Sequence, residues 1–259
     1  MADGSLRLRL ARRLIGRIVS RAARRGLATR GLRDTQGQES RWLKPEIEAF
    51  VPAMAAEAVR LRPHARQAEL PTFGSQLMVE MAIWTMAADR SLRACAIAPE
   101  TARQVVADLG WDIYRRMLAL SALPMRLLTR DSGRRLRWTI RALLVFPFAP
   151  SGAPGYAVRV SRDGDDLLTH FTHCPPQSFV RRMAWAEDDA DSLETFRQSW
   201  CRYDWPGADV IAGGRERGHY RRRRTLSHGD PVCDMCWISK VSRGAERGLE
   251  ERAGDVLRT

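Results

Sequence analysis

The chain has 259 residues, of which 44% are hydrophobic and 28% charged, enough to bury the core of one globular domain. No apolar run approaches the roughly 20 residues of a membrane-spanning helix, which argues against an integral membrane protein. The formal net charge is +13, and residues 1–44 contribute +9 of it, so the basic character belongs mainly to one end.

Cysteine and lysine usage indicate the compartment and the source. The cysteines are odd in number and we find no secretory signal, so we expect a cytoplasmic protein with reduced thiols. Arginine replaces lysine almost throughout, which is typical of a GC-rich bacterial genome. The five cysteines are Cys95, Cys174, Cys201, Cys233 and Cys236.

The N-terminal segment places apolar residues from Leu6 to Val19 at helical spacing among arginines, which predicts a basic amphipathic helix. Three interpretations stay open: a surface for anionic membrane or nucleic acid, an arginine-rich targeting peptide, or a solvated, partner-facing extension. Residues 28–40 are rich in Gly, Gln, Thr and Asp and predict a linker. We therefore expect an extension and linker over residues 1–44 and one domain over 45–259.

The first part of that domain, residues 45–150, shows a helical pattern. Pro45 suits the first turn of a helix that begins with acidic residues, and Pro99 opens another helix in the same way. The apolar stretch 136–148 follows a break at Ser132-Gly133 and cannot be assigned to helix or strand by its periodicity.

Residues 151–241 predict two β-hairpins with helices between them. Strands at 156–160 and 167–174 flank an Asp-Gly turn, and strands at 219–227 and 232–241 flank a turn at 228–231. Short helices are expected at 178–185 and 193–203, and a charged tail at 242–259. This order predicts an α+β fold with an antiparallel sheet.

Cys201 and Asp204 lie three residues apart on a predicted helix and share a face with Leu193 and Trp200. That face is apolar, so both side chains should point inward. Because an unpartnered buried carboxylate is costly, Asp204 should have either a hydrogen-bond donor or a function.

The predicted second hairpin separates its polar residues by alternation. Cys233 shares one face with Met235 and Trp237, whereas Asp234 and Cys236 share the other.

The strand before it has Arg222 and Arg224 on one face with Tyr220 and Leu226. An arginine on such a half-apolar face is a candidate clamp for a substrate carboxylate, and Arg224 is either that clamp or a solvated side chain with a packed stem.

Cys174 ends the first hairpin, with His173 directed to the opposite face and His170 on the same face as a candidate helper. The Cys233-x-x-Cys236 spacing is found in zinc and redox sites, but a second ligand pair is missing. We therefore expect no cofactor, with zinc held by Cys174, Cys201 and Cys233 as the alternative.

An ordered set of short motifs resembles the L-2-amino-thiazoline-4-carboxylic acid hydrolase family over residues 156–240. The motifs are Cys174-Pro175, Cys201-x-x-Asp204, Arg224-Thr225-Leu226-x-x-Gly229 and Cys233-Asp234.

The resemblance implies hydrolytic opening of a 2-aminothiazoline carboxylate ring to an N-carbamoyl cysteine. It implies a nucleophile among the three thiols Cys174, Cys201 and Cys233, and a general base or amidine-orienting carboxylate at Asp204 or Asp234. Substrate-binding residues would be Arg224, Thr225 and His170.

The leading hypothesis is thus a hydrolase, or a natural-product tailoring enzyme, that acts on a small cyclic carboxylate with a Cys/Asp cluster. A cysteine-ligated zinc or iron protein and a non-catalytic small-molecule-binding protein are the alternatives. The partner expected for the domain is a small-molecule substrate and not nucleic acid, whereas the N-terminal helix is a candidate contact for a partner or an anionic surface.

Overall fold

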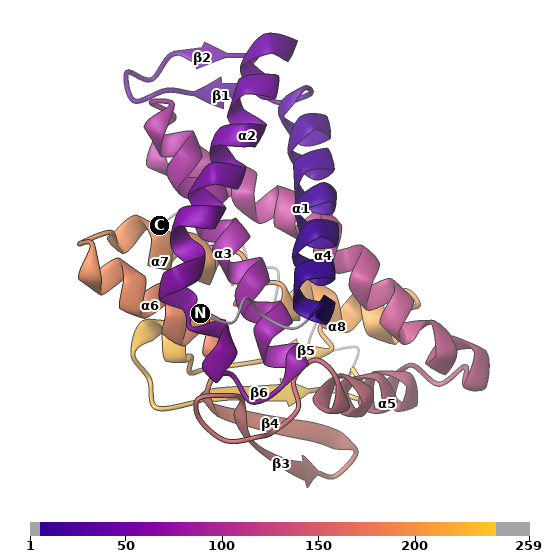
Figure 1. The fold of residues 1–259 in the computed structure, drawn as a ribbon. Coiled ribbons are helices and arrows are strands. Elements are labelled where there is room, and N and C mark those ends of the chain that lie inside the picture. The colour runs from indigo at the N-terminus through magenta and orange to yellow at the C-terminus, as the bar shows by residue number, and fades with distance from the viewer. Residues whose placement is uncertain (1–5, 242–259) are drawn as a thin grey trace.

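The computed structural model describes residues 6–241 and has an α+β architecture, as the sequence predicts (Figure 1). A bundle of N-terminal helices stands on a small antiparallel sheet, and shorter helices pack at the sides of both. The tail expected at 242–259 lies outside the described residues. Within residues 6–241, no helix combines the length and apolar character needed to cross a bilayer.

The helical layer is built around one central helix, α3, whose residues are buried on almost every side. Its neighbours pack their apolar stripes against it, so the first hydrophobic core lies within this bundle. Thr72 caps α3 by accepting a hydrogen bond from the Ser75 amide. The helices of the N-terminal half are α1 (Leu6–Leu27), α2 (Lys44–Leu61), α3 (Phe73–Ala94), α4 (Pro99–Leu128) and α5 (Ser132–Val145). Of these, α1, α2 and α4 pack on α3, whereas α5 packs on α4 and α8.

The predicted basic helix at the N-terminus is α1, and it is packed into the bundle. It contacts α2, α3 and α4, and Ile15, Ala23 and Leu27 belong to the same hydrophobic core as α3. The segment expected as a linker forms a small hairpin of β1 (Leu32–Arg33) and β2 (Glu39–Ser40). Residues 6–44 are therefore part of one packed unit with the bundle.

The sheet has the strand order β3-β4-β6-β5, and every pairing is antiparallel. Its first hairpin matches the sequence prediction, with β3 (Ala157–Asp163) and β4 (Asp166–His173) joined at Gly164, whose φ is +56°. The remaining strands are β5 (Tyr220–Arg221) and β6 (Cys233–Trp237). The alternation predicted for β6 is present, because Cys233 and Trp237 face the helices and Asp234 does not.

The structure assigns one segment that the sequence left open and differs from the prediction in two further segments. The unassigned stretch 136–148 is mostly helical, within α5, which Asp131 caps through the Arg134 amide. The helix predicted over 193–203 ends at Gln198 in α7 (Ala190–Gln198), and a turn leads into α8 (Asp204–Ala212).

The strand predicted over 219–227 stops after Arg221. A 3-10 turn, η3 (Leu226–His228), follows it, because the carboxylates of Asp230 and Asp234 accept the backbone N–H groups that a strand would have paired. The other short helices are α6 (Pro175–Ala186), η1 (Arg62–Ala65) and η2 (Gln67–Glu69).

Candidate active site

A largely apolar cavity of about 120 Å³ lies between the inner face of the sheet and the helices α4, α5 and α8. Three cysteines from distant parts of the chain line it: Cys174, Cys201 and Cys233. Asp204 and Arg222 supply its ionisable polar groups beside the thiols. Aromatic side chains make up much of the remaining wall, among them Tyr114, Phe148, Tyr156, Phe171, Trp200, Tyr203 and Trp237.

Each thiol reaches the cavity from a point where an element begins or ends. Cys174 follows β4 and stands at the start of α6, where Pro175 begins the helix. Cys201 lies in the turn between α7 and α8, and Cys233 is the first residue of β6. The sheet and the α7–α8 turn thus bring together residues that are separated by up to 59 positions in the sequence.

Cys233 has a backbone hydrogen-bond donor and a hydroxyl group beside its sulfur. The Leu226 amide donates to its Sγ at 3.2 Å, and the Thr225 hydroxyl lies 3.4 Å from the same atom. Burial raises the pKa of the Cys233 thiol, while these two contacts and the Arg222 charge act in the opposite direction. An η3 backbone amide aimed at sulfur would stabilise a thiolate if one formed.

The other two thiols are held more firmly in the neutral form. Burial raises the pKa of Cys201 to about 11, against the opposing influence of Arg222 and of the Ser227 hydroxyl, which lies 3.1 Å from its Sγ. Burial also raises the pKa of Cys174 far above its ordinary value, and ionised Cys233 or Cys201 would raise it further. All three side chains are therefore thiols at neutral pH in the resting protein.

Asp204 and Arg222 form an ion pair at the cavity wall, with Nη1 of Arg222 3.3 Å from Oδ2 of Asp204. Arg222 also donates from Nη2 to the Cys201 carbonyl at 2.6 Å, and its guanidinium lies 4.7 Å from the centre of the Trp205 ring. The Tyr220 hydroxyl donates to the same Asp204 oxygen at 3.2 Å.

Burial raises the pKa of Asp204 to about 6, while Arg222 and the Tyr220 hydrogen bond act in the opposite direction. At neutral pH this carboxylate is therefore mostly ionised, yet it accepts a proton far more readily than an exposed aspartate. A general base requires this combination.

Three residues predicted from the sequence lie outside the cavity, on the other face of the sheet. His170, Arg224 and Asp234 line a shallow depression there together with Cys236. Asp234 accepts hydrogen bonds from the Arg223 and Arg224 amides, and the half-exposed Arg224 side chain pairs with it at 3.3 Å. The structure thus corrects the expectation that these three side chains share a site with the thiols.

The cause of this difference is local. Alternation along a strand places Arg224 inward only if the chain stays extended, and β5 ends after Arg221. The same argument applies to His170. The prediction put His170 and Cys174 on one face by alternation, but the chain leaves the strand and turns into α6 at Cys174, so the alternation does not extend to this residue. His173 does not line the cavity, and it donates through Nδ1 to the Gly155 carbonyl at 2.6 Å.

Thr225 and Arg222 also occupy positions that differ from the prediction. Thr225 is buried and contacts the Cys233 sulfur through its hydroxyl, so it supports a thiol and does not line the cavity itself. Arg222 takes the position at the cavity that was expected of Arg224. The sequence did indicate this position, because Arg222 was predicted to share a half-apolar strand face with Tyr220.

Within residues 6–241, no group of three His, Cys, Asp or Glu side chains is arranged to hold a metal ion. Comparison with known proteins gives no further guidance: no family model, curated protein or solved structure matches this chain.

Proposed function

We propose that the chain is a hydrolase that opens the ring of a small thiazoline-type carboxylate inside this cavity. The observation that carries the proposal is the meeting of three thiols, one carboxylate of raised pKa and one guanidinium in a single apolar hollow. The order of the Cys174-Pro175, Cys201-x-x-Asp204 and Cys233-Asp234 motifs, which resembles the thiazoline-carboxylate hydrolase family, supports the same chemistry.

The size of the cavity supports a small cyclic substrate. Its volume is about 120 Å³. An apolar cavity of roughly 150 Å³ accommodates a benzene-sized molecule. Both volumes are of the order of one small molecule, which restricts the substrate to a small compound and excludes a peptide or a nucleotide. The thiazoline acid has more heavy atoms than benzene, so its binding also requires the cavity wall to move outward.

Arg222 is the proposed partner of the substrate carboxylate. The hydrogen bonds of its guanidinium to Asp204 and to the Cys201 carbonyl leave N–H donors on the planar fork for a second anion. Trp205 fixes the guanidinium plane from one side. A bound carboxylate would thus lie next to Asp204 and Cys201, with the ring directed toward the thiols.

Cys233 is the proposed nucleophile because the Leu226 amide donates to its sulfur and the Thr225 hydroxyl lies 3.4 Å from the same atom. Asp204 removes the thiol proton as the sulfur attacks the amidine-like carbon of the ring, and the carbon–sulfur bond of the ring breaks. Asp204 then gives that proton to the departing ring sulfur. The product of this step is an open chain joined to Cys233 through the attacked carbon.

Water completes the reaction. It attacks the same carbon while Asp204 accepts its proton, the bond from carbon to Cys233 breaks, and the proton returns to the Cys233 sulfur. One substrate and one water give one N-carbamoyl cysteine, and the enzyme is restored without an oxidant or a reductant.

Single serine substitutions test this proposal. We expect Cys233→Ser to lower kcat/KM for 2-aminothiazoline-4-carboxylate at least about 100-fold, measured as N-carbamoyl cysteine formed. Cys236→Ser is the matched control, because Cys236 lies on the same strand with the same exposed fraction of 6% but faces away from the cavity. Equal activity of the two variants would contradict the assignment.

A non-catalytic binding protein is the second candidate, and the raised pKa values of the three thiols favour it. Saturable binding of the same acid by the wild-type chain, without any product, would assign this function in place of hydrolysis.

A further inference from the structure

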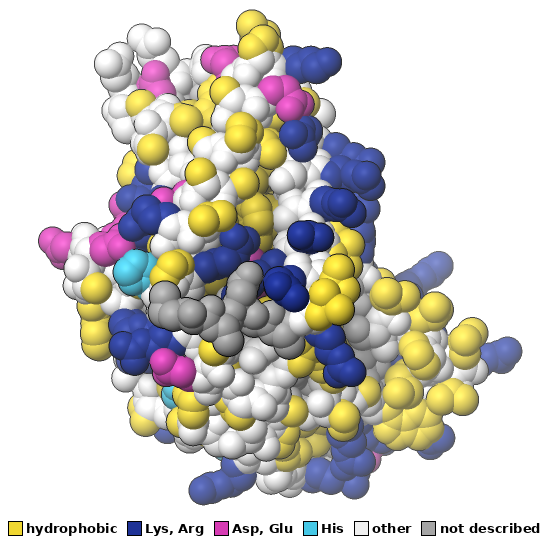
Figure 2. All heavy atoms as spheres, in the orientation of Figure 1, with side chains coloured by type: hydrophobic (Ala, Val, Ile, Leu, Met, Phe, Trp, Pro, Cys, Tyr) yellow, Lys and Arg dark blue, Asp and Glu magenta, His cyan; other side chains and the backbone are white. Residues whose placement is uncertain are grey.

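The outer face of α1 exposes a row of large aliphatic side chains. Leu6, Leu10, Leu14 and Ile18 follow one another at intervals of four residues and are 64%, 54%, 59% and 43% exposed. Residues four apart lie above one another on a helix, so these side chains form a continuous apolar stripe. Figure 2 shows hydrophobic side chains gathered at the lower end of this helix.

Arginines flank this stripe on the same helix. α1 carries eight arginines and no acidic residue, and most of these arginines are exposed. Among residues 6–241, no carboxylate lies within ion-pair distance of Arg13, Arg17 or Arg21. In Figure 2, Lys and Arg side chains line the right-hand edge over α1, whereas most acidic side chains lie at the top and on the left.

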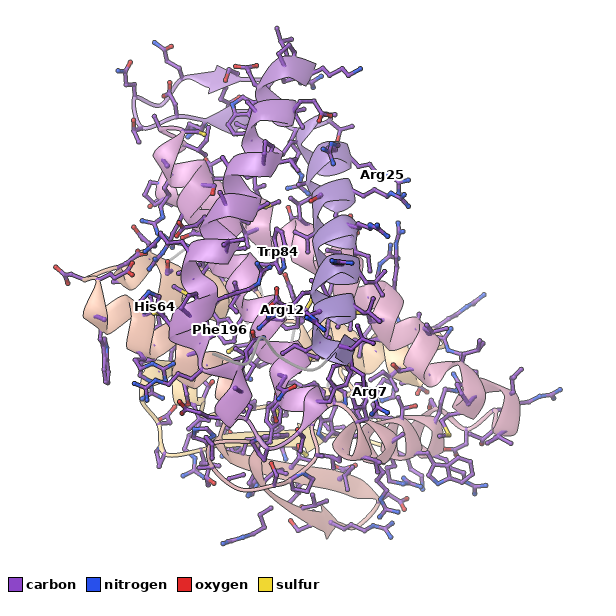
Figure 3. All side chains as sticks on the ribbon, viewed as in Figure 1. Arg7, Arg12, Arg25, His64, Trp84 and Phe196 are labelled. Atoms are coloured by element: carbon purple, nitrogen blue, oxygen red, sulfur yellow. The ribbon has the colours of Figure 1, made fainter. Side chains whose placement is uncertain are left out.

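The opposite face of α1 packs against the rest of the protein. Leu8, Ile15, Ala23 and Leu27 are buried, and Arg12 reaches inward to the Gln67 side chain at 2.7 Å. Figure 3 shows Arg12 near Trp84 of α3, while Arg7 and Arg25 extend away from the bundle. The helix is thus anchored on one side, and the stripe with its arginines remains available to a partner without local unfolding.

A second exposed apolar region lies where α4 ends. Leu120, Leu127 and Leu128 are 71%, 81% and 70% exposed. Figure 2 shows hydrophobic side chains gathered over this end of α4 and over α5, on the same side of the view as the α1 face.

We propose that the outer face of α1 docks the protein on a bilayer surface with anionic headgroups. The aliphatic stripe would enter the boundary between headgroups and acyl chains, and the flanking arginines would contact the lipid phosphates. This proposal rests on α1 alone and is independent of the chemistry in the cavity.

The chemistry of this face separates a bilayer from two other occupants. A nucleic acid would satisfy the arginines but would leave the leucine and isoleucine side chains against charged phosphates and water. A second copy of this chain, related by a twofold axis through α1, would bring two arginine-rich helices together and meet like-charge repulsion. A lipid surface satisfies both the apolar stripe and the positive charge.

Vesicle co-sedimentation of the full chain tests the proposal. We expect binding to vesicles that contain phosphatidylglycerol, weak binding to pure phosphatidylcholine vesicles, and release of a large part of the bound protein at high salt. The triple variant Arg13→Gln, Arg17→Gln, Arg21→Gln should bind anionic vesicles about 100-fold more weakly, which is about fivefold for each arginine.

The apolar stripe is tested by Leu10→Asp with Leu14→Asp, which should lower binding at least about tenfold at any salt concentration. Val59→Asp on α2 is the matched control, because Val59 is 61% exposed and lies outside α1. Circular dichroism melts establish that each variant is folded. Salt-sensitive binding of the unmodified chain is required by the proposal, and its loss on substitution of α1 residues assigns the binding to this face.

Three results would overturn the proposal. The first is absence of binding to anionic vesicles by the unmodified chain. The second is equal binding by the Leu10→Asp, Leu14→Asp variant and the Val59→Asp control. The third is tighter binding to a duplex DNA or RNA than to the vesicles, which would assign the face to nucleic acid.

Discussion

Arg222 and Asp204 form an ion pair with an N–O distance of 3.3 Å at the wall of the cavity that three thiols share. The two residues come from different structural contexts, since Asp204 begins α8 and Arg222 follows β5. Tyr220 fixes the carboxylate from the strand side through its hydroxyl. The pair joins the helical layer to the sheet at the point where we place the chemistry.

The pH dependence of turnover should report the ionisation of Asp204. Because burial raises the pKa of this carboxyl to about 6, kcat/KM should rise with pH through about 6 and level off above it. Asp204→Asn should remove this rise and most of the activity. The control is Asp234→Asn on the outer face of the sheet, and a similar loss in both variants would contradict the role of Asp204.

The stability of the protein should depend on the same group. The folded-state pKa of about 6 lies above the unfolded value of about 3.9, so folding favours the protonated carboxyl. Its stabilising contribution is therefore complete below pH about 4 and is lost as the pH rises through about 6. Denaturant titrations should show the free energy of unfolding of the wild type, relative to Asp204→Asn, falling by about 3 kcal/mol across this range. A relative rise would contradict the assigned sign.

The sequence predicted those parts of the fold and of the site that follow from a local pattern which the structure retains. The Asp-Gly turn defines one hairpin, and the alternation of β6 puts Cys233 and Asp234 on opposite faces; both were predicted correctly. Cys201 and Asp204 line one cavity although the helix predicted to carry them is interrupted at Ser199. A three-residue separation brings side chains to one side in a tight turn as well as in a helix.

The misplaced residues share a different cause. Arg224 and His170 were assigned to a face by counting along a strand past the point where the chain leaves it. The aromatic wall involves long-range packing, because Tyr114 of α4 stacks on Tyr203 with ring centres 5.5 Å apart. No local pattern around either tyrosine indicates that contact.

Thiol accessibility gives a third prediction. Iodoacetamide at neutral pH should label Cys95 first, because it is the exposed cysteine and the cavity thiols are sheltered. Burial raises the pKa of Cys95 as well as that of the cavity thiols, so accessibility decides the order. Peptide mass spectrometry should place the fast phase at Cys95, and Cys95→Ser should abolish it. A fast phase that persists in this variant and maps to Cys174, Cys201 or Cys233 would show that a cavity thiol is already a reactive thiolate.

The buried carboxylate of Glu80 should matter for stability and not for turnover. It is fully buried and accepts hydrogen bonds from Arg62 at 2.8 Å and from the Trp84 indole at 3.1 Å. Glu80→Ala leaves the Arg62 guanidinium without this partner and should lower the free energy of unfolding by about 3 kcal/mol.

The control for this prediction is Glu48→Ala, which removes an exposed ion pair with Arg24 and should leave the unfolding midpoint nearly unchanged. Equal unfolding midpoints for the two variants would contradict the predicted contribution of the buried Glu80 carboxylate to stability.

The central claim is that the cavity of Cys233, Asp204 and Arg222 opens a thiazoline ring, and turnover followed by NMR measures it most directly. With 2-aminothiazoline-4-carboxylate, the wild-type chain should form N-carbamoyl cysteine, and Cys233→Ser, Asp204→Asn and Arg222→Met should each form it at least about 100-fold more slowly. No product from the wild type, or the same rate from all four proteins, would contradict the account.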